Sequence, residues 1–132
     1  RTFITNVLEW LRNGESIFGF DDHVSQPTRV EDLVRAVVAL LARGKTGTWH
    51  IASRGEATEY EVAKHIAELL MKSEVEVLPL RRMQQGRAAT RPQYSALSCT
   101  KLEAEGIPMP TWKEAVTAYV RTIRDGGTKV IR

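Results

Sequence analysis

The sequence predicts an α/β fold in which short strands alternate with about five helices. Two observations carry this prediction: a helix-start signal recurs along the chain, and short extended segments lie between the helices. The signal is the pattern T-x-x-E, which begins at Thr28, Thr58, Thr100 and Thr111. In this capping box the threonine hydroxyl accepts a hydrogen bond from the amide three residues later, and the glutamate accepts one from the threonine amide. Each occurrence is therefore expected to open a helix.

Apolar residues spaced three and four positions apart predict helices over residues 2–13, 29–43, 59–72, 101–105 and 112–124. Gly14, Gly44 and Gly106 stand where left-handed residues end the first, second and fourth of these. The second helix has the widest apolar stripe, and we expect it to be well buried. That stripe consists of Val30, Leu33, Val34, Val37, Val38 and Leu41.

Three segments rich in β-branched and aromatic residues predict strands over residues 16–20, 48–52 and 75–80. Residues 81–96 show no period and are expected to form a long loop, and loops of such length are usually functional. Beyond residue 125, Gly126 and Gly127 predict a flexible tail over residues 126–132.

The composition fits one small globular domain or lobe. Of the 132 residues, 42% are hydrophobic and 27% are charged, as in ordinary soluble domains. A single cysteine, Cys99, rules out an internal disulfide and favours a reducing, cytoplasmic location. No apolar run approaches the roughly 18 residues of a membrane span, so no membrane contact is expected. The chain opens at Arg1 directly in a predicted helix, which we interpret as a piece of something longer.

The basic residues gather in one place only, at Arg81, Arg82, Arg87 and Arg91 of the predicted long loop. The cluster has no interleaved aromatic residues and no recognition helix, so nucleic-acid binding is not expected. Guanidinium groups make paired, charge-assisted hydrogen bonds to phosphate, which favours an anionic small molecule as the ligand. An ordinary solvated basic loop is the alternative.

The chain lacks the motifs of catalytic and cofactor sites. It has no glycine-rich turn for a dinucleotide, no phosphate-binding P-loop and no zinc motif, and its three histidines are far apart. We therefore predict no catalytic, cofactor-binding or metal-binding residue. Tyr60 and Lys64 spell Y-x-x-x-K, but we interpret them as a packed tyrosine and a solvated lysine. Asp21 and Asp22 could form a turn, a hydroxyl-recognising pair or half of a cation site, and we favour the turn.

Several segments, taken together, resemble one family. The run D-D-H-V-S-Q-P-T at residues 21–28, followed by E-D-L at 31–33, resembles the D-D-Q-x-G-x-P-T…D-L segment of dTDP-4-dehydrorhamnose reductases, which are extended short-chain dehydrogenases/reductases. Residues 47–50, 55–63, 91–102 and 106–115 resemble further segments of that family in the same order. His23 and Ser25 depart from the glutamine and glycine that are usual there.

The resemblance implies a fold and a function. It makes residues 1–125 the C-terminal nucleotide-sugar-binding lobe of a Rossmann-type enzyme, whose N-terminal domain, binding NADPH or NADH, is absent from this chain. Whole enzymes of the family reduce dTDP-4-dehydrorhamnose to dTDP-L-rhamnose. Their catalytic tyrosine and lysine lie in the N-terminal domain, so this chain alone is expected to be inactive.

The same resemblance implies which residues touch the substrate. Arg91 matches the arginine whose loop approaches the nucleotide diphosphate, and Pro92 would hold the preceding residue extended. Gln26 and Thr28 lie at the carboxyl end of a predicted strand, where open α/β sheets bind ligands. Glu31 matches a position that allows a Mg²⁺-assisted subunit contact in some members, although a capping box explains it equally well.

Other functions within the same fold stay open. A non-catalytic regulatory or interaction subunit, such as the regulatory subunit of methionine adenosyltransferase, has this fold. Another nucleotide-sugar epimerase or reductase is a further alternative. If the lobe folds alone, helices that normally pack on the Rossmann sheet expose an apolar face, so we expect self-association into a homo-oligomer.

Overall fold

A computed structural model describes residues 2–81 and 92–124 of the chain. Helices and strands alternate along it, which confirms the predicted α/β class. The chain divides into two compact units: the first contains Arg1–Ser25 and Ala57–Ser95, and the second contains Gln26–Glu56 and Ala96–Arg132. Each unit thus combines segments that are distant in sequence. No helix in the described ranges is long and apolar enough to cross a membrane.

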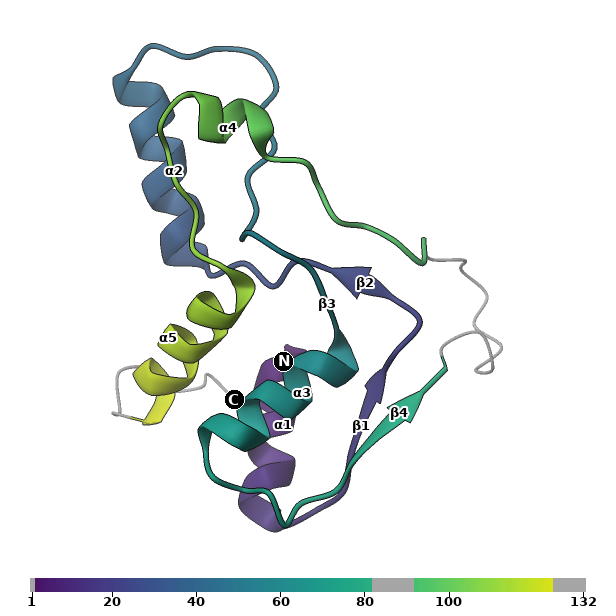
Figure 1. Cartoon of the computed structure of the whole chain (residues 1–132). Helices are drawn as coiled ribbons and strands as arrows, with labels where there is room; N and C mark the ends of the chain where they lie inside the picture. The colour runs from purple at the N-terminus through teal and green to yellow at the C-terminus, as the bar shows by residue number, and fades with distance from the viewer. Residues whose placement is uncertain (1, 82–91, 125–132) are drawn as a thin grey trace. The chain divides into compact units, whose positions relative to one another are not determined.

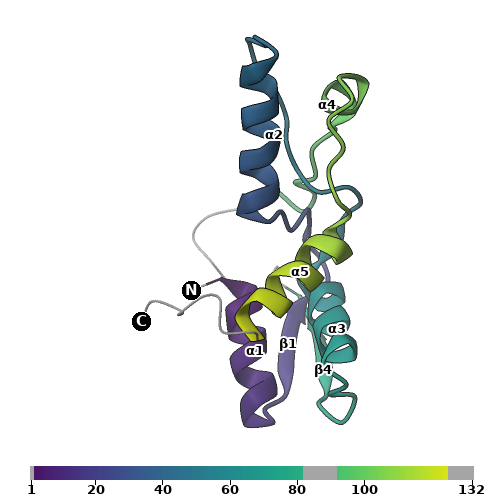
Figure 2. The same cartoon turned by 90° about the vertical axis from the view of Figure 1, so that its left-hand side faces the viewer.

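The first unit is built on two parallel strands with helices on one face. Helix α1 (Phe3–Asn13) leads to strand β1 (Ile17–Phe20), and helix α3 (Glu59–Leu69) leads to strand β4 (Val77–Leu80). Strand β1 pairs in parallel with β4, while the short strands β2 (Val24–Ser25) and β3 (Ala57–Thr58) pair antiparallel. Helices α1 and α3 lie side by side on the same face of the β1–β4 pair (Figures 1 and 2).

Glycine at position 19 lets β1 approach α3 closely. A Cβ atom built on Gly19 would lie 2.6 Å from the Cα of Tyr60, which is closer than real atoms come. Ile17, two residues earlier and so on the same face of the strand, is fully buried. The buried apolar residues of this unit form its core, namely Val7, Leu11, Ile17, Ala57, Val62, Ala63, Ile66 and Ala67.

The helix ends of the first unit follow local sequence. Thr58 and Glu61 form the expected reciprocal capping box at the start of α3, and Gly14 ends α1 with a φ of 70°. Thr2 and Thr5 form a further box at the start of α1. This box does not fit the pattern T-x-x-E, because the hydroxyl of Thr5 takes the place of the glutamate carboxylate.

The second unit contains helices α2 (Val30–Ala42), α4 (Thr100–Ala104) and α5 (Trp112–Arg124). Its core cluster consists of Ala36, Leu40, Leu102, Ile107 and Met109. The prediction of a strand over residues 48–52 is wrong. This segment pairs with no described strand, although Trp49 and Ile51 pack against the core cluster as alternate residues of an extended segment would.

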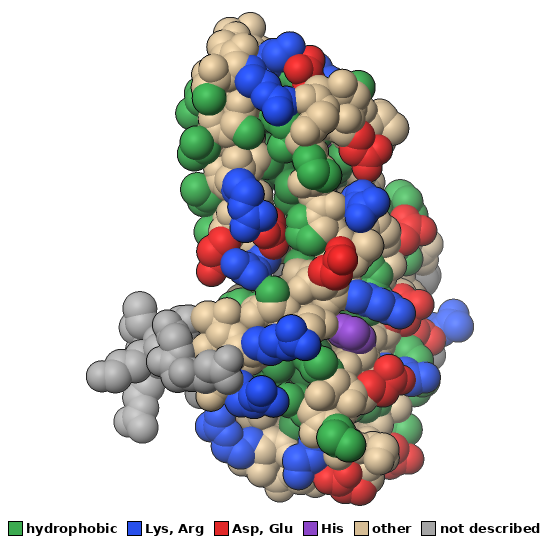
Figure 3. Space-filling model, turned by 60° about the vertical axis from the view of Figure 1, so that its left-hand side comes forward, with side chains coloured by type: hydrophobic (Ala, Val, Ile, Leu, Met, Phe, Trp, Pro, Cys, Tyr) green, Lys and Arg blue, Asp and Glu red, His purple; other side chains and the backbone are tan. Residues whose placement is uncertain are grey.

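The expectation that the apolar stripe of α2 is buried is also wrong. The helix buries Asp32, Ala36 and Leu40 instead. All six stripe residues are exposed, for example Leu41 at 70%, and Figure 3 shows hydrophobic side chains in a row along the outer side of this helix. On the opposite side of α2, Ala36 and Leu40 belong to the core cluster, and the wide stripe faces outward.

Two of the four predicted capping boxes do not form, and both of these are in the second unit. Helix α2 has Arg29 as its N-cap residue, without a side-chain cap, and Thr100 is the first residue of α4 rather than its cap. The box at Thr111 is confirmed: Glu114 accepts from the Thr111 amide at 2.7 Å, and its own amide donates to the Thr111 hydroxyl at 3.3 Å.

Candidate functional site

The carboxyl ends of the two parallel strands of the first unit meet at one edge. Asp21 and Asp22 form the bend that follows β1, in agreement with the turn interpretation. Arg81 follows β4 directly, and its Nε atom lies 3.7 Å from Oδ1 of Asp21. The Asp21 amide donates to the carbonyl of Leu80 at 3.1 Å, which extends the pairing by one residue. Ligands in open α/β sheets bind at such an edge.

The described ends of the predicted arginine-rich loop both contact the segment that follows β1, at Asp21 and at Val24 of β2. The loop leaves β4 through Arg81 and returns at residues 92–95, where Tyr94 forms a parallel bridge with Val24. The Val24 amide donates to the carbonyl of Gln93 at 2.7 Å, and the Ser95 amide donates to the carbonyl of Val24 at 3.0 Å. Both attachments fall within the D-D-H-V-S segment of residues 21–25.

The structure describes three of the four predicted substrate-contact residues. Arg91 lies outside the described residues, as do Arg82 and Arg87. Pro92 is described and exposed, at the returning end of the loop in the first unit. Gln26 and Thr28 belong to the second unit. Their role as substrate contacts therefore stays a prediction.

The side chains of Gln26 and Thr28 already have partners within the second unit. The side-chain amide of Gln26 forms two hydrogen bonds with the backbone of Leu97. It accepts one from the Leu97 amide at 2.6 Å and donates one to the Leu97 carbonyl at 3.2 Å. The Thr28 hydroxyl donates to the carbonyl of Gln26 at 2.9 Å and accepts from the amide of Ser53 at 3.0 Å. The predicted cap at Thr28 is thus replaced by a link between two loops.

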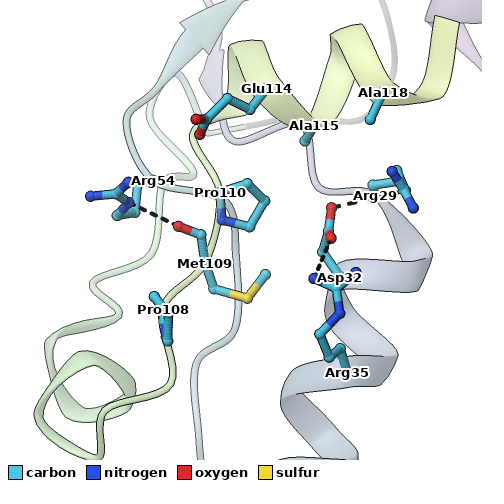
Figure 4. A pocket seen from close by; sticks show the side chains of 10 residues that line it. All are labelled: Arg29, Asp32, Arg35, Arg54, Pro108, Met109, Pro110, Glu114, Ala115 and Ala118. Atoms are coloured by element: carbon cyan, nitrogen blue, oxygen red, sulfur yellow. Dashed lines mark hydrogen bonds and ion pairs between the residues drawn. The ribbon is translucent and has the colours of Figure 1, made fainter. Parts of the chain in front are cut away.

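The second unit also contains a charged pocket that the sequence reading missed. It has a volume of about 440 Å³ and lies between α2, α5 and residues 108–110 (Figure 4). Asp32 lines the pocket and is almost fully buried, and its carboxylate accepts a hydrogen bond from Nη1 of Arg35 at 3.0 Å. Nε of Arg54 donates a hydrogen bond to the carbonyl of Met109 at 2.8 Å. The charged groups in the pocket therefore engage one another and nearby backbone. No sequence motif predicted this group of charged residues, because they come from three separate segments of the chain.

Tyr60 and Lys64 contact each other at the start of α3. The Lys64 ammonium lies over the face of the Tyr60 ring, 5.5 Å from its centre. Tyr60 is half-buried at the start of α3, and Lys64 is exposed. The interpretation as a packed tyrosine and a solvated lysine is confirmed.

Glu31 forms an ion pair with the neighbouring Arg29. Its carboxylate is 2.9 Å from Nε of Arg29. A hydrogen bond from its own backbone amide, followed by the contact with Arg29, holds the pKa of Glu31 below its ordinary value. Among the described residues, no group of three or more histidine, cysteine, aspartate or glutamate side chains could hold a metal ion.

Comparison with known proteins decides the family. Residues 1–124 match the family described as the RmlD substrate binding domain. The chain belongs to this family. The RmlD domain is 34% identical over 111 residues to a dTDP-4-keto-6-deoxy-D-glucose reductase of Streptomyces niveus, covering 83% of this chain and 38% of that protein. It is 29% identical over 119 residues to the spore coat polysaccharide biosynthesis protein SpsK of Bacillus subtilis (strain 168), covering 90% of this chain and 41% of that protein.

Solved structures agree with this assignment. A dTDP-4-dehydrorhamnose reductase of Clostridium acetobutylicum superposes with a TM-score of 0.85 at 27% identity, over 94% of this chain and 44% of that one. A dTDP-4-dehydrorhamnose reductase of Bacillus anthracis, solved in complex with NADP, gives 0.82 at 29% identity, over 92% of this chain and 43% of that one. The RmlD domain therefore has the fold of part of these Rossmann-type enzymes, and it spans about two fifths of the length of the relatives named above.

Proposed function

We propose that this RmlD domain binds the nucleotide-sugar substrate of an NAD(P)H-dependent reductase that acts on a dTDP-4-keto-6-deoxy sugar, as in the conversion of dTDP-4-dehydrorhamnose to dTDP-L-rhamnose. One observation carries the proposal. The arginine-bearing segment begins at the carboxyl edge of the β1–β4 pair, where Arg81 lies beside Asp21, and it returns to the residues that follow this edge, where Tyr94 bridges Val24 of β2. The names of the relatives supply the class of substrate.

In this proposal the domain supplies binding groups and no redox chemistry. The Arg91 guanidinium donates paired hydrogen bonds to the diphosphate, and Pro92 keeps the residue before it extended. Gln26 and Thr28, in the second unit, are proposed as further substrate contacts. The nicotinamide cofactor, NADPH or NADH, and the proton donor belong to the nucleotide-binding part of the whole protein. The NADP in the Bacillus anthracis relative supports a nicotinamide cofactor.

Subunit contacts form a separate part of the proposal. A Mg²⁺ ion at Glu31 would need further oxygen ligands from a second subunit, and it would have to displace the guanidinium of Arg29 at 2.9 Å. Titration with Mg²⁺ alone, followed by sedimentation velocity, tests this. Association that rises with Mg²⁺ and is lost in Glu31→Gln supports a cation-assisted contact, and no response removes the ion from the proposal.

Calorimetric titration of the chain with dTDP tests the diphosphate contact. We expect saturable binding that Arg91→Ala weakens about tenfold or more, because hydrogen bonds to charged groups contribute about 1.5–3 kcal/mol. Arg121→Ala removes an exposed arginine from α5 and serves as the matched control, with no expected change. Equal losses in the two variants, or no binding at millimolar dTDP, would refute the proposal.

A regulatory role is the second candidate function, because one relative is named as a subunit of a different enzyme. The chain is 29% identical over 111 residues to methionine adenosyltransferase 2 subunit beta of Danio rerio, covering 79% of this chain and 33% of that protein. An assay of the whole protein with NADPH and a dTDP-4-keto sugar separates the two candidates. Turnover supports the reductase, and nucleotide binding without turnover supports the regulatory subunit.

A further inference from the structure

The charged pocket of the second unit has an apolar side and a polar side. Its volume of about 440 Å³ lies within the usual range of small-molecule sites. In Figure 4, Met109 and Pro110 lie on one side of the space and Asp32 lies opposite them. Ala115 and Ala118 of α5 line a further side. All the lining residues belong to the second unit, so the pocket is formed within one compact unit.

The charges around the pocket are balanced. Three arginines line it, and three carboxylates lie on it or beside it. The arginines are Arg29, Arg35 and Arg54, and the carboxylates are Glu31, Asp32 and Glu114. Glu31 does not line the pocket itself, but its carboxylate is 2.9 Å from Nε of Arg29 and compensates that guanidinium. Because neither sign is in excess, the pocket has little preference for a ligand with a net charge.

Two groups of the pocket keep hydrogen-bonding capacity. Oδ1 of the almost fully buried Asp32 accepts from Nη1 of Arg35 at 3.0 Å, whereas Oδ2 has only the ion pair with Nε of Arg29, at 4.0 Å. That distance is too long for a hydrogen bond, and no other group in residues 2–81 and 92–124 donates to Oδ2. Arg54 donates to the carbonyl of Met109 through Nε, which leaves its two terminal nitrogens for a ligand. The pocket therefore offers both an acceptor and donors.

A neutral sugar has the chemistry that these two sides need. Each of its hydroxyl groups can donate to a carboxylate and accept from a guanidinium, and the C–H face of its ring can cover apolar side chains. The apolar lining consists of Pro108, Met109, Pro110, Ala115 and Ala118. A phosphate or an amine would bring a charge that the balanced pocket does not compensate. A hydrocarbon would leave Oδ2 of Asp32 without a donor.

We propose that this pocket binds a neutral sugar, with one hydroxyl donating to Oδ2 of Asp32 and the ring lying against Met109 and Pro110. The terminal nitrogens of Arg54 donate to further hydroxyls. The inference goes beyond the proposed function, because it adds a site for a ligand that has neither a base nor a phosphate. The proposed diphosphate contact at Arg91 takes no part in it.

The methyl group of Met109 reports on the pocket. In a chain labelled with carbon-13 at its methionine methyl groups, Met109 is buried and lines the pocket, whereas Met71 is exposed in the first unit. Titration with D-glucose, D-galactose and L-rhamnose should move the Met109 resonance saturably with at least one sugar and leave that of Met71 unchanged. A Met109 resonance that responds to none of the sugars refutes the proposal. Tighter binding of D-glucose 6-phosphate than of D-glucose refutes the neutral class of ligand.

Filling the pocket tests whether the response comes from it. Ala118 is half-buried and lines the pocket, so Ala118→Phe should occupy the space and weaken sugar binding about tenfold or more. Ala104→Phe places the same ring at an exposed position of α4 and is the matched control, with no expected change. Sugar binding that is unchanged in Ala118→Phe, with the helix content retained, would contradict the proposal.

Two further substitutions separate this site from the proposed nucleotide contact. Asp32→Asn keeps the shape of the acceptor and removes its charge, so it should weaken sugar binding several-fold, because hydrogen bonds to ionised groups are the stronger ones. Arg91→Ala should leave the sugar titration unchanged even where it abolishes dTDP binding, so the proposed function can fail without this inference. Loss of the Met109 response in Arg91→Ala would mean that sugar and nucleotide share one site, and it would refute the separate pocket.

Discussion

Helices α3 and α2 have similar apolar periodicity and opposite environments. In α3 the apolar row is buried, with Val62 at 2% and Ile66 at 0% exposure. In α2 the corresponding residues are open, with Val34 at 53% and Val38 at 58%. Helix α3 packs on β1 and lies beside α1 within the first unit, whereas α2 contributes the buried residues Ala36 and Leu40 to the core cluster of the second unit. Periodicity thus predicts that an apolar row exists, and the neighbouring elements decide whether it is covered.

The largest expected effect is on the free energy of unfolding, and it comes from comparing one substitution in α3 with one in α2. Ile66→Ala should lower the free energy of unfolding by about 2–5 kcal/mol, because it leaves a cavity in a fully packed core. Val38→Ala should change it by less than about 0.5 kcal/mol, since the side chain is already in solvent. Urea denaturation followed by circular dichroism measures both. A comparable loss in the two variants would mean that a partner covers α2 under the conditions of the experiment.

The second prediction concerns what covers the α2 row in solution. We expect the chain to self-associate through this surface, so that sedimentation velocity gives a concentration-dependent mass. The double substitution Val34→Lys and Val38→Lys should raise the dissociation constant at least tenfold, or about 1.4 kcal/mol, with little loss of helix content.

Met71→Lys is the control for that experiment, since it places the same charge on an exposed apolar position of the first unit, 87% exposed. It should leave association unchanged. A wild-type chain that stays monomeric at high concentration contradicts the prediction, and so does an equal response of the two lysine variants.

The smallest expected effect is pH dependence at the start of α5. The Thr111 amide, and then its hydroxyl, donate to the Glu114 carboxylate and hold the pKa of Glu114 below its ordinary value of 4.5. A carboxylate whose pKa is lowered by folding stabilises the protein above the unfolded pKa, and this contribution is lost as the pH falls through the folded pKa. Glu114→Gln should therefore be less stable than wild type at pH 7, and the difference should shrink at pH 3.

Glu103→Gln is the matched control for the capping experiment. Glu103 completes the T-x-x-E pattern at Thr100, where no side-chain cap forms, so its replacement should change the thermal midpoint little at either pH. A difference between wild type and Glu114→Gln that is constant from pH 7 to pH 3 would contradict the proposed role of the ionised carboxylate.

The positions of the helices were determined by the sequence itself. Helix α5 has the predicted bounds, α1 differs from its prediction by one residue, and the boxes at Thr58 and Thr111 form as expected. These features depend on hydrogen bonds between residues three or four positions apart, so a short stretch of sequence contains all the information. The family motifs also lie within short segments of sequence, and the match over residues 1–124 confirms the family that they predict.

Tertiary structure decided the features that depend on distant partners. Residues 48–52 have strand-like sequence but no described strand beside them, and Thr28 binds the amide of Ser53 instead of capping α2. The attachment of Tyr94 beside Val24 joins residues separated by seventy positions, a distance over which spacing carries no signal. A strand, a buried face and a binding edge each need a second surface, and only the folded chain shows which surface that is.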